Sequence, residues 1–210
     1  MFIQLITSGI DSWIIPYGKK LQEMLNAKGH VCKYLIGEEN VEKGDILIFL
    51  SYEKIFHQLS LNKHNLVIHE SDLPKGRGMS PLTWQILEGS NKIPITLLEA
   101  TEKVDAGVIY KRDFIFLEGH ELLSEIKDKQ GWATINLVIW FVENYPQSSQ
   151  GQQQNGTPSF YKRRTEVDSK LDIEKSISDQ FNLLRVCDNN RYPAYFEKNG
   201  IKYKILIEKY

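Results

Sequence analysis

Short apolar runs separated by amphipathic segments dominate the first third of the chain. Most positions within each run are apolar, with little alternation, which is typical of parallel strands covered on both faces. The runs comprise residues 2–6, 31–36, 45–50 and 65–68. Between the first two runs, Leu21, Met24 and Leu25 recur at helical spacing, and Gly29 ends the segment. This order of elements predicts an α/β fold with a Rossmann-like, mostly parallel sheet flanked by helices.

The pattern becomes helical again after the fourth apolar run. Ser80 followed by Pro81 predicts a helix start with the serine side chain as its cap, and Gly89 predicts the end of that helix. Beyond it we expect two strands and one long amphipathic helix, at residues 94–98, 107–117 and 121–145.

A polar, glycine-bearing stretch of low complexity divides the rest of the chain. We interpret residues 147–159 as a linker between a core at 1–146 and an extension at 160–210. Within the extension, the sequence pattern predicts a hairpin with its turn at 198–200, preceded by a helix that carries Ile177, Phe181 and Leu184. Because a hairpin offers exposed strand edges, we expect a homodimer through this C-terminal region.

Composition and charge narrow the classes of function. A content of 41% hydrophobic and 11% aromatic residues supplies the core of an ordered globular protein. The chain has 26 basic and 27 acidic residues, so it lacks the basic excess typical of nucleic-acid binding. Its two cysteines show no metal-binding or redox spacing. Neither a signal-peptide pattern nor a membrane-spanning run is found, and we expect a cytoplasmic protein.

The most constrained chemistry follows the apolar run at residues 65–68. His69 leaves this predicted strand and enters a loop rich in proline and glycine, at the edge where open α/β sheets form their sites. Asp105, in an Asp-Ala-Gly turn, can orient the imidazole and stabilise its protonated form. We predict that His69 and Asp105 form a catalytic acid–base pair. A structural histidine and an ordinary turn are the alternatives.

The loop after His69 supplies candidate substrate-binding groups. Its glycines let the backbone approach a ligand closely. Arg77 is either a ligand for a phosphate or carboxylate or a solvated loop arginine. Ser71 is no serine-hydrolase nucleophile, because it lacks the Gly-x-Ser-x-Gly context. The predicted substrate-binding residues are Ser71, Lys75, Gly76, Arg77 and Gly78. A basic run at 162–164 is either a solvated patch or a contact to a nucleotide diphosphate.

These residues resemble the signature of the 10-formyltetrahydrofolate-dependent formyltransferases. That signature reads Asn-x-His-x-Ser-x-Leu-Pro followed later by Asp-Ala-Gly; here residues 67–74 read Val-Ile-His-Glu-Ser-Asp-Leu-Pro and residues 105–107 read Asp-Ala-Gly. The resemblance runs over residues 45–207, and its tail is similar to that of methionyl-tRNA and sugar N-formyltransferases. Because the tRNA enzyme adds a further basic domain that this sequence lacks, we expect a sugar substrate.

The resemblance implies a reaction and the residues that perform it. A formyl group would pass from the cosubstrate 10-formyltetrahydrofolate to the amine of a nucleotide-linked amino sugar. The expected acceptor is a UDP- or dTDP-4-amino-4,6-dideoxyhexose, and the form of the loop suggests the pseudaminic-acid branch. His69 would be the general base, assisted by Asp105, without a metal. The residues implied in folate binding are Ser51, Tyr52, Ile55, Asp105 and Gly107. For Tyr52, a structural role at the end of a strand is the alternative.

Val67 departs from this pattern. The family has asparagine there, whose amide positions the formyl group and stabilises the oxyanion, and loss of one such donor costs roughly 100- to 1,000-fold in rate. Asn65, four residues before His69, would face the same side of the strand but lies about 13 Å back along it, too far to substitute simply. Ser71 or a loop amide could replace it. Two alternatives therefore stay open: a formyltetrahydrofolate hydrolase, and a non-catalytic folate- or nucleotide-sugar-binding module.

Overall fold

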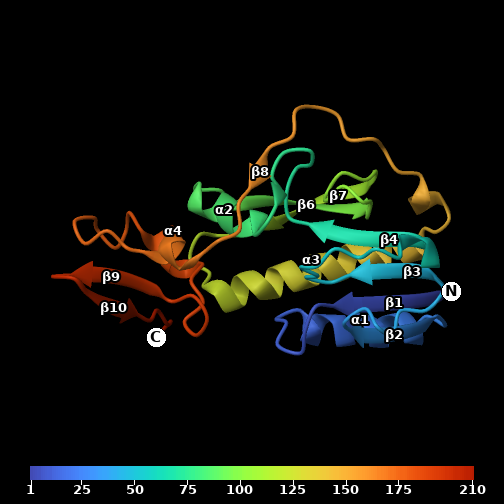
Figure 1. Ribbon diagram of the computed structural model, residues 1–210, viewed down its shortest axis with the longest axis horizontal. Helices are drawn as coiled ribbons and strands as arrows, with labels where there is room; N and C mark the ends of the chain where they lie inside the picture. Colours follow the sequence, from blue (N-terminus) through green and yellow to red (C-terminus); the bar gives the residue numbers. More distant parts are fainter.

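A central sheet of six strands organises the protein, for which a computed structural model describes residues 1–210 (Figure 1). The strands are β1 (Phe2–Thr7), β2 (Val31–Ile36), β3 (Gly44–Phe49), β4 (Asn62–His69), β6 (Lys92–Glu99) and β7 (Ile109–Phe116). Their order across the sheet is β2-β1-β3-β4-β6-β7. The first four are parallel, whereas β6 runs antiparallel to both of its neighbours. The predicted α/β fold with a mostly parallel sheet is confirmed.

Both faces of the sheet are covered, which explains the nearly continuous apolar runs. Two helices, α1 (Ile15–Ala27) and α3 (Leu123–Glu143), pack together on one face and enclose the main core (Figure 1). The opposite face holds a smaller cluster of Ile6, Leu47, Phe49 and Phe56. Because strand residues alternate between faces, buried positions on both sides require apolar residues throughout. None of the helices combines the length and apolar character that a membrane span requires.

The predicted helix after Ser80 is present as α2 (Pro81–Leu87), but its start differs from the expectation. The Ser80 side chain makes no capping hydrogen bond, and its backbone is left-handed with φ of +53°. A side-chain cap normally requires extended backbone at that position. The predicted serine cap is therefore wrong, and Pro81 alone marks the helix start.

The segment predicted as a linker crosses back over the sheet. In Figure 1 it arcs from the end of α3 to β8 (Phe160–Tyr161), which pairs in parallel with β5 (Arg77–Gly78). On the way, Gln152 and Ile109 exchange two backbone hydrogen bonds of 2.8 Å. Residues 147–159 therefore hold the loop after His69 in place as well as connecting two parts of the chain.

The C-terminal hairpin lies at one end of the molecule, away from the central sheet (Figure 1). Strands β9 (Ala194–Lys198) and β10 (Ile201–Ile205) pair antiparallel through Asn199 and Gly200, both with positive φ. The preceding helix α4 (Phe181–Arg185) is shorter than predicted. Ile177 lies outside it and is exposed, because Gln180 and the side chains around Ser176 hold residues 172–180 in turns.

A buried arginine attaches the extension to the core. The Arg185 side chain is fully buried; its Nη2 donates to Asn91 Oδ1 at 2.7 Å, and its Nη1 lies 3.6 Å from Glu121 Oε2. Burial alone would raise the pKa of Glu121, but hydrogen bonds from Lys129 and nearby backbone amides lower it to about 2. The carboxylate therefore stays charged and can pair with Arg185 over the ordinary pH range.

Candidate active site

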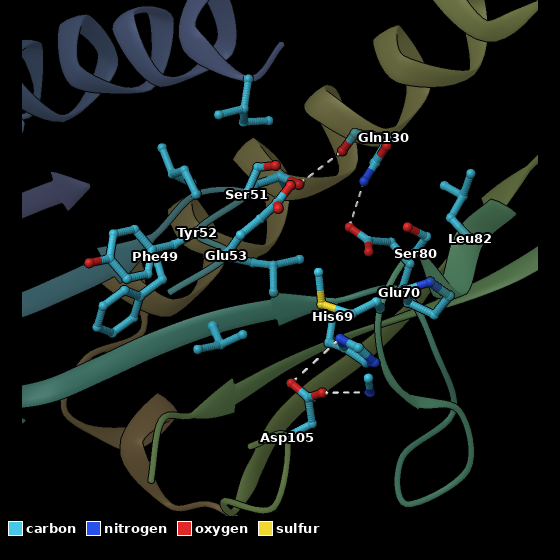
Figure 2. Close-up of a pocket in the computed structure, with 18 of the residues that line it drawn as sticks. Phe49, Ser51, Tyr52, Glu53, His69, Glu70, Ser80, Leu82, Asp105 and Gln130 are labelled. Carbon is cyan, nitrogen blue, oxygen red and sulfur yellow. Dashed lines mark hydrogen bonds and ion pairs between the residues drawn. The ribbon is translucent and has the colours of Figure 1, made fainter. Parts of the chain in front are cut away.

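His69 occupies the last position of β4, where its ring is held by two oxygen atoms (Figure 2). Nε2 lies 2.8 Å from the carbonyl oxygen of Gly76, to which it donates a hydrogen bond, and Nδ1 lies 3.5 Å from Asp105 Oδ1. The side chain is almost wholly buried, with 7% exposure. The ring is therefore fixed in orientation by the loop that follows it and by a second loop between β6 and β7.

Asp105 reaches the imidazole from a strained turn. Its backbone is left-handed, with φ of +53°, a conformation that persists in non-glycine residues only when the surroundings hold it. Its Oδ2 accepts a 2.9 Å hydrogen bond from the Gly78 amide, and its backbone oxygen accepts one of 2.8 Å from Gln154. At Gly78, a Cβ would lie 2.4 Å from the Tyr161 carbonyl, so only glycine allows this approach. The structure brings the two predicted residues, His69 and Asp105, together.

An open cavity of about 510 Å³ lies beside this pair and has two different sides. Aromatic side chains line one side, where the Phe49 ring centroid is 5.3 Å from that of Tyr52 and 5.5 Å from that of Phe56. The other side is formed by α3, α2 and the C-terminal extension, and it carries the basic residues Lys127, Arg164 and Arg191 beside the acidic Asp188. The cavity can therefore accept a planar ring on one side and an anionic group on the other.

The residues predicted to bind folate are divided between the cavity and the core. Ser51, Tyr52, Ile55 and Asp105 all line the cavity. Burial and the nearby Glu38 carboxylate raise the pKa of Tyr52 to about 12, so its hydroxyl stays protonated and donates to Glu38. Gly107 does not line the cavity, because it packs against the Glu99 carbonyl so closely that a Cβ would lie 1.9 Å away.

Most residues predicted to bind substrate lie outside the cavity. Only Gly78 lines it, while Ser71 and Gly76 are buried residues of the loop and Lys75 is exposed outside the cavity. The Arg77 guanidinium is also buried, and its Nη2 donates to Gln154 Oε1 at 2.6 Å. The physical reason is the crossing segment 147–159, which supplies partners to this loop from far along the chain. Arg77 is therefore engaged by the protein itself.

The comparisons with known proteins agree with this geometry. No family model matches the chain. Its sequence is similar to methionyl-tRNA formyltransferase of Mycoplasmopsis pulmonis, with 32% identity over 144 residues that cover 67% of this chain and 50% of that protein. The chain belongs to the formyltransferase family. It spans about half the length of several of the curated relatives it matches.

Solved structures of related folds match nearly the whole of this formyltransferase-family chain. Methionyl-tRNA formyltransferase from Clostridium thermocellum has a TM-score of 0.83 and 19% identity, covering 99% of this chain and 92% of that one. A 4-N formyltransferase from Francisella tularensis has a TM-score of 0.73 and 16% identity, covering 99% and 97%. HypX from Aquifex aeolicus in complex with tetrahydrofolic acid has a TM-score of 0.76 and 16% identity, covering 98% and 37%. At these identities the likeness shows the fold.

The position of Val67 in this formyltransferase-family protein leaves the oxyanion donor open. Val67 lines the cavity and packs with the apolar clusters around Phe49 and Leu98. Asn65 is buried away from the cavity, where its Nδ2 donates to the Leu59 carbonyl at 2.9 Å. Ser71 does not line the cavity either, and its buried hydroxyl has no hydrogen-bond partner. Neither the Asn65 nor the Ser71 side chain is therefore placed to replace the asparagine that the family has at position 67.

Glu70 and Gln130 are among the polar residues of the cavity lining that the sequence did not indicate. Glu70 directly follows His69, and its Oε1 accepts a 2.7 Å hydrogen bond from Nε2 of Gln130 on α3 (Figure 2). Burial raises the pKa of the Glu70 carboxyl, although the His69 ring and the Gln130 amide oppose this. An acidic residue next to the candidate base was a visible signal, but a charged loop residue is ordinarily solvated. Only the position of α3 shows that it is enclosed.

Proposed function

We propose that this protein transfers a formyl group from 10-formyltetrahydrofolate to the amine of a nucleotide-linked amino sugar. The observation that carries the proposal is the His69–Asp105 pair, whose side chains lie at the wall of a cavity with one aromatic and one basic side. The family membership supports formyl transfer, and the fold is shared with a 4-N formyltransferase and with HypX bound to tetrahydrofolic acid.

The aromatic side of the cavity suits the pterin ring of the folate. Tyr52 and Phe56 flank Phe49 with tilted rings, and planar heterocycles pack well against such surfaces. Backbone groups of the loop that carries Ser51 and Ile55 can provide hydrogen bonds to the ring edge. This arrangement supports the folate contacts that we propose for Ser51, Tyr52 and Ile55.

The basic side suits a phosphorylated acceptor. Arg164 lines this side, and its buried Nε has no hydrogen-bond partner, although its Nη2 donates to the Asp168 carbonyl at 3.2 Å. Guanidinium groups bind phosphate strongly and with defined geometry. Because the net charge of the chain is −1, a small nucleotide-linked sugar fits better than a polyanionic tRNA. A UDP- or dTDP-linked 4-amino-4,6-dideoxyhexose, such as a pseudaminic-acid precursor, is the acceptor that we propose.

In the proposed mechanism the sugar amine attacks the formyl carbon and forms a tetrahedral intermediate. His69 accepts a proton from the attacking nitrogen and returns it to the folate nitrogen that leaves. Asp105, 3.5 Å from Nδ1, stabilises the imidazolium that exists between these two transfers. The products are the N-formylated sugar nucleotide and tetrahydrofolate.

The test combines the purified protein, 10-formyltetrahydrofolate and a panel of UDP- and dTDP-linked 4-amino sugars, with mass spectrometry as the readout. We expect one sugar to gain the mass of a formyl group. Formate release without any amine would indicate a hydrolase instead. Folate binding with no turnover on any acceptor would indicate a binding module, and formylation of methionyl-tRNA alone would contradict the sugar substrate.

We also propose a homodimer through the C-terminal hairpin. β9 and β10 form a two-stranded sheet with no third strand, and Ile201 and Tyr203 are exposed on it. Unpaired strand edges that carry apolar side chains favour pairing with a second copy. Light scattering should give twice the chain mass, and a monomer mass at all concentrations would contradict the proposal.

A further inference from the structure

A second carboxyl group faces the cavity directly after the candidate base. Figure 2 shows Glu70 between His69 and Gln130, with its carboxyl turned toward α3. Its backbone oxygen accepts a 2.6 Å hydrogen bond from Gln85 Nε2 on α2, so two helices hold the residue. Gln130 is the one residue whose side chain donates to the Glu70 carboxyl, and no lysine or arginine forms an ion pair with this carboxyl. A ligand in the cavity can therefore reach a carboxylate that the protein has left without a counter-ion.

The charged groups around Glu70 leave that carboxyl available. His69 on β4 is engaged by Gly76 and Asp105, and Lys127 on α3 lies 3.7 Å from Asp188. On α2 no charged side chain lines the cavity. The remaining charged residues that line it are Glu53, Lys54, Glu99, Glu102, Arg164 and Arg191.

The geometry of His69 also calls for a second proton acceptor. An amine is an ammonium ion at neutral pH, and it must lose a proton before its nitrogen can attack. In the structure, Nε2 of His69 donates to the Gly76 carbonyl and Nδ1 faces the Asp105 carboxylate. His69 relays one proton, from the attacking nitrogen to the folate nitrogen, so the additional proton of an ammonium ion needs another acceptor. The Glu70 carboxyl lines the same cavity and can take it.

We propose that the Glu70 carboxylate binds the ammonium group of the acceptor and accepts its first proton. This inference rests on the proposed formyl transfer. The freed lone pair forms the C–N bond to the formyl carbon, and the carbonyl electrons move to oxygen. The second amine proton passes through His69 to N10 of the folate, the C=O bond re-forms and the C–N10 bond breaks. The proton on Glu70 then leaves to solvent, so each turnover releases one proton.

Burial supports this role because it makes the carboxylate more basic. The Glu70 side chain is half-buried at the cavity wall, and this desolvation raises the pKa of its carboxyl. General-base catalysis is most effective when the pKa of the base approaches the working pH. A merely structural role, in which Glu70 links the end of β4 to α3, would give an effect of mutation that does not depend on the ionisation of the acceptor.

The experiment compares wild type with Glu70→Gln on the sugar of the UDP- and dTDP-linked panel that wild type formylates. Glutamine has the same shape, and its carbonyl can still accept the hydrogen bond from Gln130. At neutral pH we expect a loss of kcat/KM for the acceptor of roughly 100-fold or more, with folate binding unchanged. Above the pKa of the acceptor amine the loss should shrink to within about threefold, because the amine then arrives neutral. Glu143→Gln, the same change at an exposed site of α3, is the matched control.

The outcomes separate the two proposals. If wild type formylates no amine of the panel, the proposed function fails and this inference fails with it. If wild type is active and Glu70→Gln equals it, only the inference is overturned. A loss that is the same at every pH also overturns it, because that would indicate a structural role. Glu70→Asp, which keeps a base, should retain more activity than Glu70→Gln, and thermal unfolding of each variant shows whether it is folded.

Discussion

The protein has two buried pairs, each of one basic and one acidic side chain, whose separations are nearly equal. His69 and Asp105 are 3.5 Å apart with side-chain exposures of 7% and 8%; Arg185 and Glu121 are 3.6 Å apart with exposures of 0% and 3%. The first pair lines the cavity, and its partners are mostly backbone atoms of two loops. The second lies outside that cavity and is held by other side chains of the core.

Burial of a basic and an acidic side chain together therefore does not by itself identify a site. Charged groups that are closed off from solvent must pair with one another, and such pairs hold elements together. Here the pair of Arg185 and Glu121 attaches α4 to the start of α3. Charges held by backbone groups at the edge of a cavity keep some capacity for a ligand. The contrast predicts that mutations in the first pair act on turnover and those in the second act on folding.

The largest expected effect concerns His69. His69→Ala should lower formyl transfer roughly 100- to 10,000-fold, the range that a positioned acid–base group contributes. Its unfolding midpoint should fall only moderately, because Asp105 keeps the hydrogen bond from the Gly78 amide. The measurement is the rate of sugar formylation beside a thermal melt, with the exposed His120→Ala as control. A variant that formylates as fast as wild type would remove His69 from the mechanism.

The sealed pair should respond in the opposite way. Arg185→Met removes the buried guanidinium that joins Asn91 to Glu121, while Glu121 keeps its pair with Lys129, so the expected cost is about 1 to 3 kcal/mol of unfolding free energy. The matched control is Lys28→Met, which breaks the exposed pair with Glu143 and should cost less than about 1 kcal/mol. Urea unfolding measures both. Equal losses in the two variants would show that Arg185 does not act as an anchor.

Acid should act on the sealed pair through Glu121. Its folded pKa of about 2 lies below its ordinary value of 4.5, so it stabilises the fold above the unfolded pKa and loses this contribution as pH falls from about 5 to about 2. The loss should amount to about 2 to 3 kcal/mol. Glu121→Gln should unfold more easily at pH 7 and show a flatter stability curve over that window. An unchanged curve would mean that other carboxyl groups control acid unfolding.

The sheet and the position of His69 could be predicted from the sequence, whereas the contacts of Arg77 and Glu70 could not. The apolar runs predicted the sheet, and the end of one run located His69, because both signals are local in the chain. The partner of Arg77 could not be found in this way, since Gln154 comes from a segment whose composition indicates only a linker. The enclosure of Glu70 depends equally on where α3 lies. Local patterns predict elements, whereas the role of a charged side chain depends on distant contacts.

Arg164 is a third charged residue, and it differs from both buried pairs. Unlike Arg185, it lines the cavity and is only half-buried, so a ligand phosphate can reach its guanidinium. Arg164→Gln should raise the KM for the sugar nucleotide about tenfold, which corresponds to about 1.4 kcal/mol, and leave the KM for folate unchanged. Arg163→Gln, which removes the neighbouring exposed charge paired with Glu53, is the control. Equal effects of the two variants would indicate general attraction by a basic surface. An effect on the KM for folate alone would reverse the proposed placement, with folate on the basic side and the sugar nucleotide on the aromatic side.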